Sequence, residues 1–234
     1  MSKQEKNVED ALAEMAGLIG DPVRIKVLWT LLEGRAFTAT ELAIHVDTSP
    51  QNLSMHLSKL IKADLLTVEV QGRHKYYAIA HPEVAHAIEA MAGLPAVPRP
   101  AQTPTQKDPI QFCRTCYDHL AGTVGVLITD SLIRQQFIRR KGSLFQVTAK
   151  GENWWPSTGI DLAGLRKKHR TFARVCLDWT ERRPHLAGSL GAALLEKMRG
   201  EQWIRPIAHT RAVQVTPKGG KALHEIFGIT LPHH

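Results

Sequence analysis

A proline-rich segment near the middle of the chain divides it into two parts. The stretch from Leu94 to Pro109 holds five prolines and few large apolar side chains. Proline fixes φ and removes a backbone donor, so we expect an extended, solvated linker over residues 95–109. The 234-residue chain is therefore expected to form two domains, residues 1–94 and 110–234, each large enough for its own core.

The first domain shows a series of helix signals followed by one hairpin. Large apolar residues recur at helical spacing over residues 8–19. Three further helices are expected to begin at capping residues, which are Asp21 before Pro22, Thr38 with Glu41 three residues on, and Ser49 before Pro50. Strand-like runs at 65–70 and 75–79 flank a tight turn, and a last helix begins at Pro82. This order predicts a winged helix-turn-helix with the hairpin as its wing.

Several short motifs of this domain are similar to those of a known family. They are Asp21-Pro22-Val23-Arg24, Thr40-Glu41-Leu42-Ala43-Ile44, residues 49–57 (SPQNLSMHL), residues 59–66 (KLIKADLL) and Gly72-Arg73-His74-Lys75-Tyr76-Tyr77. Over residues 9–92 the chain resembles the ArsR/SmtB family of bacterial repressors. The resemblance implies a homodimeric, DNA-binding transcriptional regulator that an effector releases from DNA, with the first and last helices at the dimer interface. A twofold dimer implies a palindromic double-stranded operator.

The helix that begins at Pro50 is the expected reader of DNA. At 100° per residue, Leu53, Leu57 and Leu60 share a buried face, and polar, cationic and apolar groups occupy or flank the opposite face. Such groups contact base edges or phosphates, although the same residues are also ordinary on a solvated helix. The candidate DNA contacts are Ser49, Gln51, Asn52, Ser54, Met55, His56 and Lys59 of this helix, with Arg73 and Lys75 of the wing.

The second domain contains an internal repeat. The heptapeptide at 119–125 (HLAGTVG) matches that at 185–191 (HLAGSLG), and Val147-Thr-Ala-Lys-Gly151 matches Val215-Thr-Pro-Lys-Gly219. We expect two tandem helix–hairpin–helix repeats at about 112–162 and 176–231, with His119 and His185 starting equivalent helices and a further helix over 168–180. The expected fold class of the whole chain is mainly α with small β-hairpins (α+β).

The cysteines of the second domain leave three interpretations open. The spacing Cys113-x-x-Cys116-x-x-His119 is typical of a metal cluster, but on a helix His119 would lie about 120° round from Cys113. The ordinary interpretation is small buried thiols in a helical core, which we favour. One alternative is an effector or metal site at Cys116, His119, Cys176 and His185, which would join the two halves. Another is a redox-active Cys113–Cys116 pair.

Other sequence features exclude several classes of protein. Many metal sensors of the family carry Cys-x-Cys in the first reader helix, where this chain has Ala43 and His45, so a soft-metal site there is not expected. No phosphate loop or hydrolase motif is present, so we expect no enzyme and no required cofactor. The chain lacks a long apolar span and its first residues are polar, which favours a cytoplasmic location away from membranes.

The net charge of +8 is divided unevenly between the domains. Residues 1–94 carry 9 Lys and Arg against 12 Asp and Glu, a net charge of −3, which leaves +11 for residues 95–234. The prediction of DNA binding therefore depends on the helix-turn-helix pattern and not on bulk charge.

Overall fold

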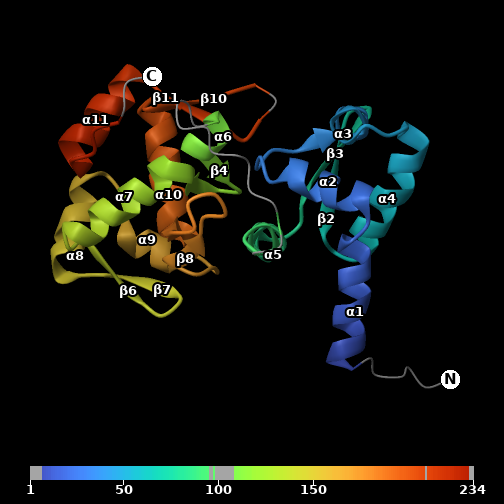
Figure 1. Cartoon of the computed structure of the whole chain (residues 1–234), viewed down its shortest axis with the longest axis horizontal. Coiled ribbons are helices and arrows are strands. Elements are labelled where there is room, and N and C mark those ends of the chain that lie inside the picture. The colour runs from blue at the N-terminus through green and yellow to red at the C-terminus, as the bar shows by residue number, and fades with distance from the viewer. Residues whose placement is uncertain (1–6, 95–96, 98–107, 209, 232–234) are drawn as a thin grey trace. The chain divides into compact units, whose positions relative to one another are not determined.

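The structure is a computed structural model that describes residues 7–94, 97, 108–208 and 210–231 (Figure 1). It divides into two compact units, Met1–Ile88 and Glu89–His234. The division falls within helix α5 (Pro82–Ala92), a few residues before the expected boundary at residue 94. Most of the proline-rich linker lies outside the described residues.

The first unit contains four helices and a three-stranded sheet, followed by α5, and its first strand lies between the second and third helices. The helices are α1 (Val8–Ile19), α2 (Pro22–Leu31), α3 (Ala39–Val46) and α4 (Pro50–Lys62), and the strands are β1 (Phe37–Thr38), β2 (Leu66–Gln71) and β3 (His74–Ile79). The sheet has the order β1-β3-β2, and all of its pairs are antiparallel. Strand β1 is the only element of this unit's described part that the sequence did not predict, because two residues carry no periodic pattern.

Each expected cap of the first unit is present. The Asp21 carboxylate accepts the backbone N–H groups of Val23 and Arg24. Thr38 and Glu41 form a reciprocal capping box, and the Ser49 hydroxyl accepts the backbone N–H of Asn52. These side chains satisfy backbone donors that a helix start would otherwise leave unpaired, so local sequence determines where the helices begin.

The second unit is built from two halves of the same design. Each half contains a hairpin, a helix, a second hairpin and a second helix (Figure 1). The first half comprises β4 (Arg114–Cys116), β5 (His119–Ala121), α7 (Gly122–Arg134), β6 (Ile138–Lys141), β7 (Leu144–Val147) and α8 (Ala149–Ser157). The second comprises β8 (Arg174–Leu177), β9 (Pro184–Ala187), α10 (Gly188–Gly200), β10 (Ile204–Pro206), β11 (Val213–Val215) and α11 (Pro217–Phe227). Two short helices, α6 (Pro109–Phe112) and α9 (Leu162–Arg166), precede the halves.

Two expectations for this unit were wrong. The order helix, hairpin, helix is present in both halves, but another hairpin precedes it, so His119 and His185 lie on strands β5 and β9 and not at helix starts. The expected helix over residues 168–180 is also absent from the structure, which has strand β8 in its second part. Strands of three or four residues leave almost no periodic signal in a sequence, whereas their pairing is visible in the fold.

The two halves are interlocked through their strands. In the four-stranded sheet β6-β7-β8-β9, the second half's first hairpin pairs with the first half's second hairpin. The first half's first hairpin likewise meets the second half's second hairpin, because Arg114 of β4 forms an antiparallel β-bridge to Ala212 just before β11. Helix α7 contacts β9, helix α10 contacts β5, and one continuous apolar core joins both halves. Neither half can therefore bury its apolar surface alone.

The repeated Val-Thr-x-Lys-Gly sequence has the same structural role in both halves. Thr148 and Thr216 cap helices α8 and α11 and accept the backbone N–H groups of Gly151 and Gly219. A Cβ atom on Gly151 would lie 2.1 Å from the Phe137 carbonyl oxygen, and one on Gly219 would lie 1.9 Å from that of Trp203. Each glycine therefore lets a helix start directly against the backbone that leads into the first strand of the preceding hairpin.

Candidate functional site

The reader helix α4 presents one face to the protein and another to solvent. Leu53, Leu57 and Leu60 are buried, and the helix packs against α2, α3 and strand β2. On the exposed side lie Ser49, Gln51, Ser54, Met55 and Lys59. Wing residues Arg73 and Lys75 are also exposed. Seven of the nine predicted contacts therefore have side chains that solvent, and hence a ligand, can reach.

His56 is a correction to the predicted contact set. It is only 6% exposed, and its Nδ1 atom lies 3.3 Å from the carboxylate of Asp21, which caps α2. His56 therefore connects α4 to α2 inside the unit and does not face solvent. The helical arithmetic placed it at the edge of the polar face, and only the position of α2 shows that this edge is covered.

Asn52 is half-buried and already has a partner. Its side-chain amide donates a hydrogen bond to the Thr48 hydroxyl at 2.8 Å. Two exposed residues that the sequence argument did not include, Ser58 and Lys62, belong to the solvent side of α4. The same count of 100° per residue places both of them opposite Leu53. Lys62 adds a second cation one turn beyond Lys59.

A second group of functional side chains lies in the second unit. Cys116 and His119 are opposed in the β4–β5 hairpin, and Cys176 and His185 are opposed in the β8–β9 hairpin. Directly opposed residues of an antiparallel pair share one face. Strands β5 and β9 lie next to each other, so each half brings one thiol and one imidazole to the same place. We call this group the Cys–His cluster.

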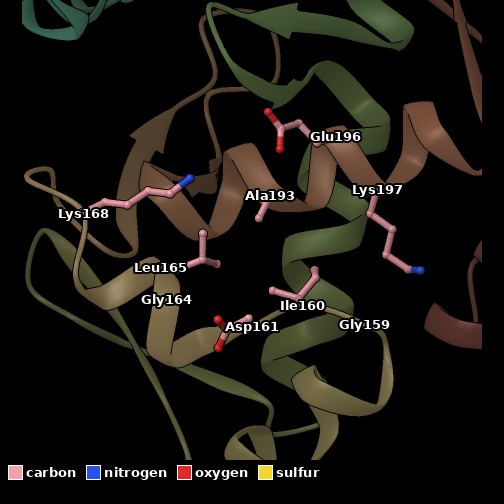
Figure 2. A pocket seen from close by; sticks show the side chains of 9 residues that line it. All are labelled: Gly159, Ile160, Asp161, Gly164, Leu165, Lys168, Ala193, Glu196 and Lys197. Carbon is pink, nitrogen blue, oxygen red and sulfur yellow. The ribbon is translucent and has the colours of Figure 1, made fainter.

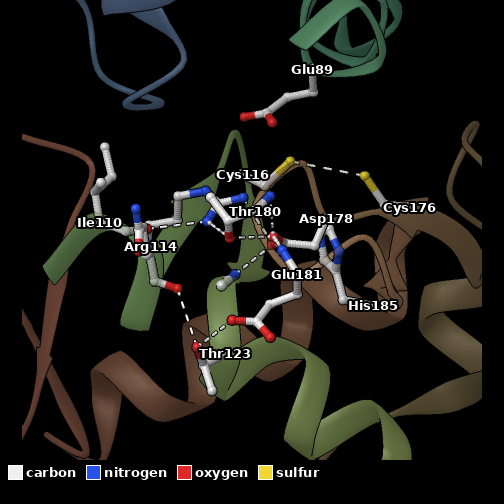
Figure 3. A network of polar contacts seen from close by, with 12 residues as sticks. Glu89, Ile110, Arg114, Cys116, Thr123, Cys176, Asp178, Thr180, Glu181 and His185 are labelled. Carbon is white, nitrogen blue, oxygen red and sulfur yellow. Dashed lines mark hydrogen bonds and ion pairs between the residues drawn. The ribbon is translucent and has the colours of Figure 1, made fainter. Parts of the chain in front are cut away.

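The four side chains of the Cys–His cluster converge and are buried. Their ligand atoms all lie within 4.8 Å of one another. A dashed line joins the two sulfur atoms in Figure 3; they are 3.9 Å apart, and the Nε2 atoms of His119 and His185 are 3.1 Å apart. Both imidazoles are 0% exposed and are stacked. The assumption of a helix through Cys113, Cys116 and His119 is therefore wrong, because Cys116 and His119 are on a hairpin.

Cys113 is not part of the Cys–His cluster. It lies in the main apolar core with Leu120 and Val124, whereas Cys116 and Cys176 pack with Ala121 and Ala187. Burial raises the pKa of the Cys113 thiol above its ordinary value, which keeps it protonated and unreactive. The structure gives no support to a reactive Cys113–Cys116 pair.

The surroundings of the cluster shift the pKa values of its two thiols in opposite directions. The hydrogen bond with Cys176, together with burial, raises the pKa of Cys116. The same hydrogen bond, helped by the imidazole of His185, lowers the pKa of Cys176. Burial alone would lower the pKa of His119, but hydrogen bonds with Asp118 and Cys176 outweigh it and raise that pKa to about 9. The two thiol pKa values are thus shifted in opposite directions, and Cys176 is the thiol whose deprotonated form the cluster favours.

A buried polar network holds the two hairpins beside the cluster. Arg114 of β4 forms an ion pair at 2.8 Å with Asp178, and both side chains are fully buried (Figure 3). Asp178 also accepts the backbone N–H groups of Gly122, Thr180 and Glu181. The network therefore ties the segment after β8 in the second half to β4 and α7 in the first.

An open hollow of about 510 Å³ lies between α9 and α10. Figure 2 shows Ile160 and Leu165 in its floor, with the charged ends of Lys168 and Lys197 extending in different directions. The hollow shares no residue with the Cys–His cluster. Because its charged groups do not converge, it provides a surface for contact but no defined set of ligand partners.

The fold and these sites define a winged helix-turn-helix protein with a second, pseudo-symmetric unit. Residues 19–69 match the family model of a helix-turn-helix domain. Over 222 residues the chain is 39% identical to the uncharacterized HTH-type transcriptional regulator YdfF of Bacillus subtilis, and the match covers 94% of this chain and 98% of that protein. The chain therefore belongs to the family of HTH-type transcriptional regulators, which confirms the class of protein that the ArsR/SmtB resemblance implied.

Two further similarities each cover about a third of the chain. Over 80 residues the chain is 35% identical to the HTH-type transcriptional regulator CmtR of Mycobacterium bovis, which covers 34% of this chain and 67% of that protein. The protein in the crystal structure of M. tuberculosis Rv0081 is 27% identical in sequence, and the two structures have a TM-score of 0.35. The match covers 37% of this chain and 87% of the Rv0081 chain. Among the helices of the described residues, none has the length and apolar character needed to cross a bilayer.

Proposed function

We propose that this DNA-binding transcriptional regulator is a homodimeric repressor of a palindromic operator. Helix α4 of each subunit enters the major groove, and the wing contacts the adjacent backbone or minor groove. An effector bound by the second unit modulates this binding. A repressor acts on the chromosome, so a cytoplasmic location and the absence of catalysis belong to the same proposal.

One observation carries the DNA interface. The solvent face of α4 bears an amide at Gln51, a thioether at Met55 and a cation at Lys59, while the opposite face is filled by buried leucines. Gln can pair with an adenine edge through two hydrogen bonds, and Lys neutralises phosphate. Arg73 at the tip of the wing supplies a further cation on a different element.

The homodimer is supported by an apolar face of α1. Val8 and Leu12 are 72% and 63% exposed, and Met15 and Ile19 continue the same stripe at helical spacing. Among the described residues of α1, only Ile19 is buried. An apolar stripe of this kind gains free energy when a second subunit covers it.

Binding to the operator is the direct test. We expect the full chain to bind a fragment of its own gene's promoter at least about 10³-fold more tightly than random DNA at physiological salt, measured by fluorescence anisotropy. Equal affinity for both fragments would refute sequence-specific regulation. The action of an effector is tested separately, by whether it releases DNA from a preformed complex of protein and operator.

Substituting Lys59→Ala is expected to weaken binding by a similar factor on all DNA sequences. The variant dimer loses one phosphate contact per subunit, so the slope of log K against log salt falls in magnitude by about two units. Anisotropy titrations at several salt concentrations measure this slope. The matched control is Lys221→Ala on α11, a lysine whose side chain is 77% exposed in the second unit. Equal salt slopes for the two variants would show that Lys59 does not contact phosphate.

Substituting Leu12→Glu is expected to convert the dimer to monomers at micromolar concentration. The new carboxylates would be buried without partners in the α1 interface, which costs several kcal/mol. Sedimentation velocity measures the mass. Ala13→Glu places the same charge about 100° round the helix, away from the stripe, and should leave the dimer intact. A dimer that persists in Leu12→Glu would show that α1 does not form the interface.

A further inference from the structure

We propose that the Cys–His cluster of the second unit binds one Zn²⁺ ion per chain, with Cys116, His119, Cys176 and His185 as its four ligands. The two halves of the repeat would thus share a single tetrahedral site, each supplying one sulfur and one nitrogen. This inference goes beyond the proposed function, because metal binding and operator binding are independent measurements.

The distances between donor atoms match a tetrahedral ion. With Zn–S bonds of about 2.3 Å and Zn–N bonds of about 2.0–2.1 Å, a tetrahedron requires sulfur atoms about 3.8 Å apart and nitrogen atoms about 3.3 Å apart. The observed separations are 3.9 Å between the sulfurs and 3.1 Å between the two Nε2 atoms. The remaining sulfur–nitrogen pairs lie within 4.8 Å, so side-chain rotations that draw them together would complete the tetrahedron.

The ligand atoms of the cluster favour a metal ion of intermediate softness such as Zn²⁺. Two thiolates and two imidazoles in a tetrahedral arrangement suit Zn²⁺, whereas Mg²⁺ and Ca²⁺ require oxygen ligands. Two thiolates also cancel the charge of a divalent cation, so the complex of ion and ligands is neutral and can be buried at lower cost. All four residues are at most 7% exposed, which excludes water from the site.

The surroundings of His119 are those of a metal ligand. The Asp118 carboxylate lies 3.3 Å from its Nδ1 atom, which leaves Nε2 directed at the cluster. Asp118 is in turn held by an ion pair with Arg170. A carboxylate that orients a histidine in this way fixes its tautomer and strengthens its bond to a metal.

A disulfide between Cys116 and Cys176 is the competing outcome. It requires the sulfurs to approach from 3.9 Å to about 2.05 Å, and it leaves both imidazoles without a role. The metal uses all four side chains at nearly their observed positions. The paired histidines, one from each half, therefore favour the ion over the disulfide.

Cobalt(II) titration of the reduced, metal-free full chain tests the proposal. We expect saturation at one Co²⁺ per chain, with thiolate-to-cobalt charge-transfer bands, intense d–d bands of a tetrahedral site, and displacement of the cobalt by Zn²⁺. Cys176→Ser should lose about half of the charge-transfer intensity, and Asp118→Asn should weaken Zn²⁺ binding by about 10–100-fold. The matched control is Cys113→Ala, which removes a buried thiol outside the cluster and should keep the cobalt spectrum.

Three results would overturn the proposal. One is a six-coordinate cobalt spectrum, or no binding, in the reduced wild-type chain. Another is an unchanged spectrum in Cys176→Ser. The third is quantitative loss of two thiols to a disulfide in air even when Zn²⁺ is supplied. The wild-type titration decides the matter even if a variant fails to fold, and the affinity for promoter DNA is scored separately.

Discussion

Substituting Arg114→Leu is expected to lower the free energy of unfolding of the second unit by about 3–5 kcal/mol. The change leaves the Asp178 carboxylate in a fully buried position without its cationic partner. Arg114 also donates to the Ile110 carbonyl and the Thr180 hydroxyl, and its guanidinium lies 4.8 Å from the ring centre of Trp179. All of these contacts are lost together.

Urea unfolding of the full chain, followed by tryptophan fluorescence, measures this loss. Four of the five tryptophans, all but Trp29, belong to the second unit. Arg183→Leu is the matched control, because Arg183 pairs with Asp130 while 54% exposed, and exposed pairs contribute at most about 1 kcal/mol. A similarly small loss in Arg114→Leu would mean that the backbone donors around Asp178 satisfy the carboxylate without the arginine.

Substituting Gly219→Ala is expected to destabilise the second unit by about 3 kcal/mol, at the upper end of the range for overpacking. The new Cβ atom would lie 1.9 Å from the carbonyl oxygen of Trp203 and 2.7 Å from its carbonyl carbon. Both are backbone atoms of the segment that leads into β10, so no side chain can rotate away. Helix α11 would have to move as a whole.

The neighbouring glycine provides the control for this prediction. A Cβ atom on Gly220 meets nothing within 4 Å. Because glycine within a helix costs about 0.5–1 kcal/mol relative to alanine, Gly220→Ala should stabilise the unit by a similar amount. Thermal unfolding of both variants gives the comparison. If Gly219→Ala were as stable as Gly220→Ala, the close contact between α11 and Trp203 would not exist in solution.

The first unit was largely predictable because its signals are local. Asp21, Thr38 and Ser49 each cap a helix a few residues away, and the apolar spacing of each helix identifies its buried face. The solvent side of α4 follows from the same count. His56 was placed wrongly because its burial depends on Asp21 of another helix, 35 positions earlier in the chain, and no local pattern records that contact.

The second unit was predictable in its duplication but not in its elements. The matching heptapeptides indicate two equivalent halves, but the same pattern predicts helix starts at His119 and His185, which lie on the strands of hairpins. Three-residue strands have no usable period, and the small residues after each histidine suit a strand end and a helix start equally well. The sequence did name the four members of the Cys–His cluster as one of its alternatives.

By itself the sequence determined the winged helix-turn-helix and the polar face of its reader helix, since both depend on residues within a few turns of one another. It also determined the duplication of the second unit, because two short stretches of similar sequence indicate it directly. The tertiary structure alone decided that Cys116 and His119 meet Cys176 and His185. That meeting requires two hairpins, 60 or more positions apart in the chain, to lie side by side in an interlocked fold. Pairing at such a separation is set by packing of the whole unit, which no short stretch of sequence encodes.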